Sequence, residues 1–170
     1  DDWDDHRWKD SFASPANTAR QRGYARAGGR NMIYTPQMII NGQDHVVGNR
    51  PRDIERLISK HARRTDGPAM TVTRAGPRIT VSAPATDAAG APFVVQLIRY
   101  RPRNEVKIAK GENAGQTLSY ANVVTALDGL GTWNGRTPLR IETDMPGGAP
   151  GVILIQGQDE GPVIAAARIP

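Results

Sequence analysis

Residues 34–42 read YTPQMIING, and this stretch determines how the rest of the chain is interpreted. Thr35-Pro36 leads into an apolar run, Met38–Ile40, which an Asn41-Gly42 pair follows. Asn-Gly pairs adopt the positive φ angles that tight β-hairpin turns require. A second apolar run, Val46-Val47, comes after the turn. The sequence therefore predicts a β-hairpin with a proline at the entrance of its first strand.

A helix is predicted before the hairpin. Ser14 is a good N-cap residue, and Pro15 occupies the first turn, where proline is tolerated. The pair Gly28-Gly29 supplies a stop signal at the other end. We therefore expect a helix over about residues 15–27.

A second helix is predicted after the hairpin. We expect Asn49 to cap it and Pro51 to open it, with Ile54, Leu57 and Ile58 on one apolar side. A Gly-Pro pair at residues 67–68 ends the helical pattern. Two helices and one hairpin thus account for the first third of the chain.

From about residue 69 the pattern changes to short strand-like runs separated by Gly, Pro and Asp. The runs are MTVT, RITVSA, FVVQLIRY, EVKIAK, TLSYANVVTAL, PLRIET, GVILIQG and VIAAARI. Seven or eight strands at this spacing are typical of an antiparallel β-sandwich. We therefore predict an α+β chain in which residues 1–67 form one domain and residues 68–170 form an all-β sandwich domain.

The composition excludes several classes of function. The net charge of +5 comes from scattered arginines, which is not typical of a nucleic-acid-binding protein. No apolar run approaches the ~20 residues that span a bilayer. The chain has no cysteine, which excludes a disulfide framework, a thiolate metal site and a nucleophilic thiol within these residues. Nothing in the sequence calls for a cofactor or indicates an oligomeric state.

The start of the chain has its own composition. It opens on DDWDDHRW, without an initiator Met and without the basic and apolar segments of a signal peptide. We expect the sequence to be a processed or truncated product.

The first 48 residues resemble the middle of a family of bacterial secreted proteins of unknown function with a thioredoxin-like fold. The shared features are Trp3-Asp4, Trp8-Lys9-Asp10, Phe12, the segment 18–24, Tyr34-Thr35-Pro36-Gln37 and Asn41-Gly42. GENAGQTLSYANVV, residues 111–124, is similar to the second domain of that family. The resemblance implies a periplasmic or secreted protein whose first domain is a partial thioredoxin-like domain.

The resemblance also implies a missing part. Members of the family carry a strand, a helix opened by Cys-x-x-Cys and a second strand before the point where this chain begins. The intact protein would then be a thiol-disulfide redox protein, whereas this cysteine-free chain holds no catalytic residue. In such folds a cis-proline pair faces the two cysteines, so the resemblance predicts a cis peptide bond between Thr35 and Pro36.

Tyr34, Thr35 and Pro36 are the main candidate binding residues. The resemblance makes them one wall of a substrate groove, where the backbone of Thr35 would pair with an extended peptide. A protein or peptide substrate is therefore the partner expected. The alternative is a purely structural proline, because proline is tolerated at the first residue of a strand.

Other candidates fall in the first eight residues. Trp3 and Trp8 would lie near the groove and form part of its binding surface, or they would anchor a loop on the core. Four aspartates and His6 resemble a site for a hard cation, but their spacing is not that of a Ca²⁺ loop, and a solvated terminal segment is favoured.

The remaining charged candidates have simpler explanations. Arg99, Arg101 and Arg103 alternate and would form an anion-binding face or a charged strand end that discourages edge pairing. His45 and His61 have no evident partner and are interpreted as structural.

Known catalytic motifs are missing from the sequence. No Ser/His/Asp grouping, P-loop or metal-spaced cluster is present, and GLGTWNG, residues 129–135, is interpreted as turn chemistry. Two functions stay open: a redox protein that is incomplete in this chain, and a non-catalytic binding or structural module that uses the β-sandwich. Fold alone does not decide between them.

Overall fold

The computed structural model describes residues 12, 14–64, 66–88, 91–108 and 114–170. These residues form two helices and nine strands, so the chain is a mixed α+β protein, as the sequence predicts. All strand pairs are antiparallel, and they build a two-stranded, a three-stranded and a four-stranded sheet.

Helix α1 spans Pro15–Ala27 and has the predicted ends. The Ser14 hydroxyl oxygen accepts a hydrogen bond from the backbone N–H of Asn17 at 3.1 Å. After Gly28, Gly29 adopts a φ of 65°, the left-handed conformation that commonly ends helices.

The hairpin consists of strands β1 (Gln37–Ile40) and β2 (Asp44–Val47). Its turn uses Asn41 and Gly42 with φ angles of 55° and 70°, which confirms the prediction made from the Asn-Gly pair. The Thr35–Pro36 bond is cis, as predicted. Ala91–Pro92 is also cis, and nothing in the sequence led us to expect it.

Helix α2 spans Pro51–Ala62, but its N-cap differs from the prediction. The cap is Arg50, which makes no side-chain capping bond, and not Asn49. Pro51 already occupies the first helical turn, so Asn49 lies one residue too early to cap. Leu57 is buried as expected, whereas Ile58 is 50% exposed.

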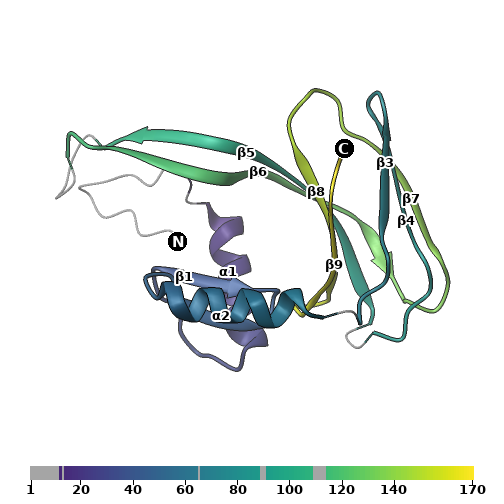
Figure 1. Ribbon diagram of the computed structural model, residues 1–170, viewed down its shortest axis with the longest axis horizontal. Helices are drawn as coiled ribbons and strands as arrows, with labels where there is room; N and C mark the ends of the chain where they lie inside the picture. Colours follow the sequence, from purple (N-terminus) through teal and green to yellow (C-terminus); the bar gives the residue numbers. More distant parts are fainter. Residues whose placement is uncertain (1–11, 13, 65, 89–90, 109–113) are drawn as a thin grey trace.

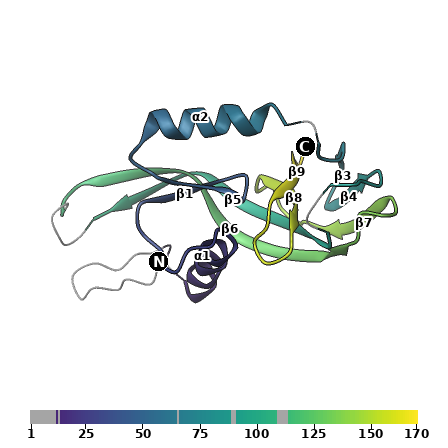
Figure 2. The same ribbon diagram turned by 90° about the horizontal axis from the view of Figure 1, so that it is seen from below.

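The two helices cover opposite faces of the hairpin. Figure 2 shows α2 above the hairpin and α1 below it. Side-chain hydrogen bonds tie each helix to its own face, from Gln21 of α1 to Gln37 and from His61 of α2 to Asp44. The first part of the chain is therefore a helix–hairpin–helix layer arrangement.

The second part of the chain holds two sheets. One has the order β3 (Thr71–Ala75), β4 (Arg78–Ala83), β7 (Leu139–Asp144). The other has the order β6 (Thr117–Trp133), β5 (Phe93–Lys107), β8 (Gly151–Gly157), β9 (Val163–Arg168). No helix occurs among the described residues after 66, in agreement with the all-β prediction.

The hydrophobic core lies between these two sheets. Ile79 and Val81 of β4 face Phe93, Val95 and Ile155 of the other sheet, and all five are fully buried. The Phe93 and Trp133 rings pack with centroids 5.7 Å apart. Alternate residues of each strand point into this core, as expected for packed sheets.

Strands β5 and β6 are longer than predicted. FVVQLIRY and EVKIAK were predicted as two strands, but β5 runs through Pro102 without a break. Beyond Arg99, β5 is paired with β6 alone, so one side of the strand makes no ladder bonds and a proline is tolerated there. Likewise, residues 129–133 of the predicted turn GLGTWNG are the last five residues of β6.

The extra length of β5 and β6 forms a two-stranded ribbon. The ribbon extends from the sandwich over α1, as Figure 1 shows. Phe12, just before α1, packs edge-on against Tyr120 of the ribbon with ring centroids 5.2 Å apart. The ribbon thus connects the two parts of the molecule above α1.

Candidate functional site

The segment Tyr34–Pro36 links α1 to the hairpin and lies at the open end of the hairpin. Tyr34 is half-buried, whereas Thr35 and Pro36 are exposed. The Tyr34 carbonyl oxygen accepts a hydrogen bond from the Gln21 side-chain amide at 3.3 Å. The Pro36 carbonyl oxygen accepts one from the Gly48 N–H at 2.9 Å. The segment is therefore held at both ends and presents its middle to solvent.

A chain of side-chain hydrogen bonds lies behind this segment. The Gln21 amide also donates to the Gln37 side-chain oxygen at 2.9 Å, and the Gln37 amide nitrogen lies 3.1 Å from Nδ1 of His45. If Gln37 donates, Nδ1 accepts and His45 is neutral with its proton on Nε2. The Tyr34 carbonyl can only accept, so the direction of these bonds is set there, and neutral His45 is the form that completes the chain.

The environment of His45 favours its neutral form. Burial lowers the pKa of His45 below its ordinary value of 6.5, and the charge of Arg30 lowers it further. Asp44 and the backbone carbonyl of Tyr24 oppose these effects. His45 was interpreted as structural without an evident partner in the sequence, and strand pairing and helix packing supply Gln37 and the Tyr24 carbonyl as its partners.

The other predicted binding residues, Trp3 and Trp8, lie outside the described residues, as do the acidic residues around them. Within the part of the chain that the structure describes, no group of three His, Cys, Asp or Glu side chains is placed to hold a metal ion. No described helix is long and apolar enough to cross a bilayer.

His61 also has a partner that the sequence did not reveal. Its Nε2 lies 2.7 Å from the Asp44 carboxylate, which also accepts a bond from Lys60 at 2.8 Å. The bonds from Lys60 and His61 lower the pKa of Asp44. This cluster ties α2 to β2. The buried Nδ1 of His61 has no hydrogen-bond partner among the described residues.

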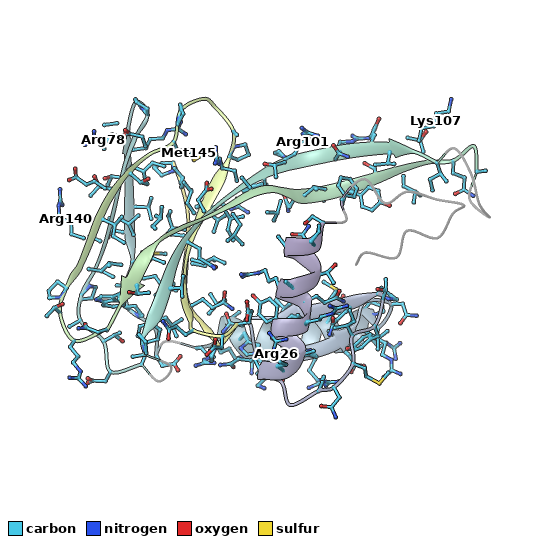
Figure 3. The ribbon with its side chains drawn as sticks, turned by 180° about the vertical axis from the view of Figure 1, so that it is seen from behind. Arg26, Arg78, Arg101, Lys107, Arg140 and Met145 are labelled. Carbon is cyan, nitrogen blue, oxygen red and sulfur yellow. The ribbon has the colours of Figure 1, made fainter. Side chains whose placement is uncertain are left out.

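The three alternating arginines are engaged by their neighbours. Arg99 pairs with Asp128 at 2.6 Å, Arg101 donates to Asn104 at 2.6 Å, and Arg103 pairs with Glu105 at 2.8 Å. Figure 3 shows Arg101 on the β5–β6 ribbon, away from the sandwich core. Each of the three arginines thus has a neighbouring oxygen as a partner, and the anion-binding face considered above stays a prediction.

A polar cluster that was not predicted from the sequence lies between α1 and the four-stranded sheet. Arg20 donates to the Tyr24 hydroxyl at 2.9 Å and to the Gln156 side-chain oxygen at 3.0 Å, and it lies 3.4 Å from the Gln96 oxygen. The Gln156 amide in turn donates to Tyr24 at 3.0 Å. Gln96 and Gln156 are polar residues within the apolar runs FVVQLI and ILIQG. A glutamine at such a position indicates that a polar group packs on the strand, and this pattern could have predicted the cluster.

Comparison with known proteins places the chain in a family. No curated protein matches it significantly. A crystal structure of a protein from Agrobacterium tumefaciens is similar over 95% of this chain and 72% of its own, with a TM-score of 0.70 and 28% sequence identity. Residues 1–156 match the family described as Protein of unknown function (DUF1223). The chain therefore belongs to the DUF1223 family.

Proposed function

We propose that this chain carries the peptide-binding side of a thiol-disulfide redox site, and that the cysteine pair of that site lies in residues of the parent protein outside this sequence. The chain itself has no cysteine. Its part in the reaction is to hold the substrate. The related structure is longer than this chain, since only 72% of it is covered, which leaves room for a further segment.

The observation that carries the proposal is the position of Tyr34–Pro36 at the open end of a hairpin between two helices. In thioredoxin-like folds, which the sequence resembles, the residues before such a hairpin line the substrate groove. Here Thr35 and Pro36 are exposed, and Gln21 fixes the carbonyl of Tyr34 just before them. An exposed segment at the entrance of a strand can contribute to binding an extended peptide.

The proposed chemistry is disulfide exchange with a protein substrate. A thiolate of the parent protein attacks one sulfur of the substrate disulfide, a mixed disulfide forms, and the released substrate thiolate takes up a proton. The second thiol then displaces the substrate, so the substrate is reduced and the dithiol is oxidised. Residues 34–36 orient the peptide around the sulfur under attack.

An insulin-reduction assay on the full encoded protein tests this function. We expect insulin reduction by dithiothreitol to be faster with the protein than without it. Gln21→Ala should raise KM about fivefold with little change in kcat, because it releases the Tyr34 carbonyl that positions the peptide. Gln43→Ala, at the opposite end of the hairpin, is the matched control. A full encoded sequence without Cys-x-x-Cys, or a rate equal to that of dithiothreitol alone, contradicts the proposal.

We also propose a periplasmic or secreted location, because an oxidising compartment provides disulfide-bonded substrates. Fractionation of cells that express the full encoded protein should recover it with periplasmic or extracellular markers. Recovery with cytoplasmic markers contradicts the location.

The second candidate function is a binding module that uses the β-sandwich and needs no cysteine. The observation that favours it is a groove beside strand β9, described next. A parent protein without a cysteine pair would favour this function over the redox function.

A further inference from the structure

A groove of about 350 Å³ lies between the outer edge of β9 and the segment that leads into β3. One wall is the run of residues 162–166, and the other includes Gly67, Pro68 and Met70. The volume falls within the range of small-molecule and peptide sites. Figures 1 and 2 both show β9 and β3 next to each other.

The groove lies between two open sheet edges. Strand β9 is the last strand of the four-stranded sheet, and β3 is the first strand of the three-stranded sheet. Neither strand has a neighbouring strand on its outer side within the described residues. An added strand in this position would lie along the outer edge of β9 and beside the start of β3.

The register of β9 identifies the backbone groups that face the groove. The Ile169 N–H donates to the Gly151 carbonyl, so Ile169 is hydrogen-bonded to β8. In an antiparallel ladder the backbone N–H and C=O groups of successive residues point alternately toward the partner strand and away from it. With Val152 opposite Arg168 and Leu154 opposite Ala166, the backbone groups of Ala166 and Arg168 point away from β8. Ala166 is exposed, and its outward N–H and C=O make no backbone hydrogen bond to another segment within the described residues.

The chain already pairs with this edge at one point. The Val163 N–H donates to the Asn41 carbonyl at 3.0 Å, and the Asn41 side-chain amide donates to the Val163 carbonyl at 3.0 Å. Asn41 thus satisfies Val163 as a neighbouring strand would. Gly67 lies against the Ile164 carbonyl oxygen. Beyond these two contacts the edge is open at Ala166.

The charges around the groove favour an acidic ligand. Arg64 and Asp66 neutralise each other through an ion pair at 2.6 Å. Arg63 and Arg168, one at the end of α2 and one on the open edge of β9, are exposed and make no ion pair within the described residues. The charges of the residues that line the groove therefore cancel, and the positive charge near it comes from Arg168, on the open edge along which an added strand would lie, and from Arg63, next to Arg64.

We propose that this groove binds an extended acidic segment of another polypeptide, which adds as a strand to β9 at Ala166. Backbone pairing supplies the binding and the arginines select the charge. The site lies beside the hairpin turn, and Pro36 lies at the other end of strand β1, about 13 Å away along the strand. The two sites use different residues, so this proposal does not depend on the redox proposal.

Binding of the peptide acetyl-Glu-Val-Thr-Val-Glu-amide to the isotope-labelled 170-residue chain, followed by NMR, tests the proposal. We expect shifts at the amides of residues 163–168. Ala166→Pro removes the outward N–H and should weaken binding about fivefold or more. Proline is tolerated in edge strands, so the variant should still fold. Ala166→Thr keeps the N–H and should bind like the wild type.

Two further comparisons do not depend on the folding of Ala166→Pro. N-methylation of both valines in one probe and of the threonine in another blocks opposite edges of the peptide, and one of the two should lose binding. A probe with lysines in place of the glutamates should bind more weakly, and Arg63→Gln with Arg168→Gln should remove that difference.

The proposal is overturned if both methylated probes bind as well as the parent peptide, if the shifts lie elsewhere, or if the lysine probe binds equally well. A dimer of the chain alone that Ala166→Pro dissociates would assign the groove to a second copy. That outcome would also overturn the proposal.

Discussion

At the scale of single residues, two glycines show how closely the two parts of the chain approach each other. A Cβ on Gly67 would overlap the backbone carbonyl oxygen of Ile164, which the strand holds in place. A Cβ on Gly23 of α1 would meet the carboxylate of Glu160, the far end of a flexible side chain. The two positions therefore respond differently to the same substitution.

Gly67→Ala should lower the free energy of unfolding by about 1–3 kcal/mol, because the linker must move away from β9. Gly23→Ala should change it by less than about 1 kcal/mol, since Glu160 can rotate and alanine favours the helix. Urea denaturation of both variants and the wild type measures the difference. Equal effects at the two positions would contradict the close contact at Ile164.

His45 makes stability depend on pH in a defined window. Its pKa is lowered by burial and by Arg30 below the ordinary value of 6.5, so the unfolded chain binds the proton more tightly than the folded protein. The contribution is complete above about pH 6.5 and is lost as the pH falls through the folded pKa.

We expect the urea midpoint of the wild type to be lower at about pH 5.5 than at about pH 7.5. His45→Gln, which does not titrate, should have a smaller difference. The lowered pKa of Asp44 does not interfere, because its contribution is lost only below its ordinary value of 3.8. A difference of the same size in the variant would assign the pH dependence to other groups.

At the scale of elements, α1 is held between the hairpin and the four-stranded sheet by polar contacts. Gln21 binds the hairpin side, and Arg20 binds Gln96 and Gln156 on the sheet side. Arg20 is half-buried and its described partners are neutral oxygens, so its contribution comes from hydrogen bonds and not from an ion pair.

Arg20→Ala should lower the free energy of unfolding by about 1–3 kcal/mol, because Gln96 and Gln156 lose a charged donor in a buried place. Arg20→Lys should not restore it, since a single ammonium group cannot match the planar guanidinium. Arg22→Ala, on the exposed side of the same helix, is the control and should have an effect within about 0.5 kcal/mol. Equal losses at both positions would contradict the polar cluster.

The elements themselves were predicted with mixed success. The capping residues of α1 and the Asn-Gly pair correctly predicted the ends of the helix and the hairpin turn. Both features depend on interactions between residues that are close together in the sequence. Such local signals failed for β5 and β6, where the residues around Pro102 were left out of the two predicted strands and residues 129–135 were interpreted as a turn. Pairing between two long strands outweighs a local breaker when the partner strand is continuous.

At the scale of the whole molecule, the two parts of the chain are joined at several points. Arg20 binds Gln156, Asn41 binds Val163, and Phe12 packs on Tyr120. The predicted boundary at residues 67–68 falls in the segment between α2 and β3, where Gly67 contacts Ile164. These contacts favour unfolding as one unit.

We therefore expect a single cooperative transition. In a variant with Trp3 and Trp8 replaced by phenylalanine, fluorescence reports Trp133 in the sandwich core, while circular dichroism reports both helices. The two urea curves should coincide. Separate midpoints would show that the helix–hairpin–helix part and the sandwich unfold independently.

The sequence by itself determined the features that depend on neighbours along the chain. These are the two helices, the Asn41-Gly42 hairpin, the change to antiparallel strands after residue 69 and, through the resemblance, the cis bond at Pro36. Thiol-disulfide function and the thioredoxin-like assignment stay proposals.

Only the tertiary structure decided which residues meet across the chain. It gave His45 and His61 their partners, assembled Arg20 with Gln96 and Gln156, and opened the groove between β9 and β3. The physical reason is that these contacts form between different elements, from Gln37 and His45 on neighbouring strands to Asn41 and Val163 more than a hundred residues apart, and their proximity depends on how the elements pack.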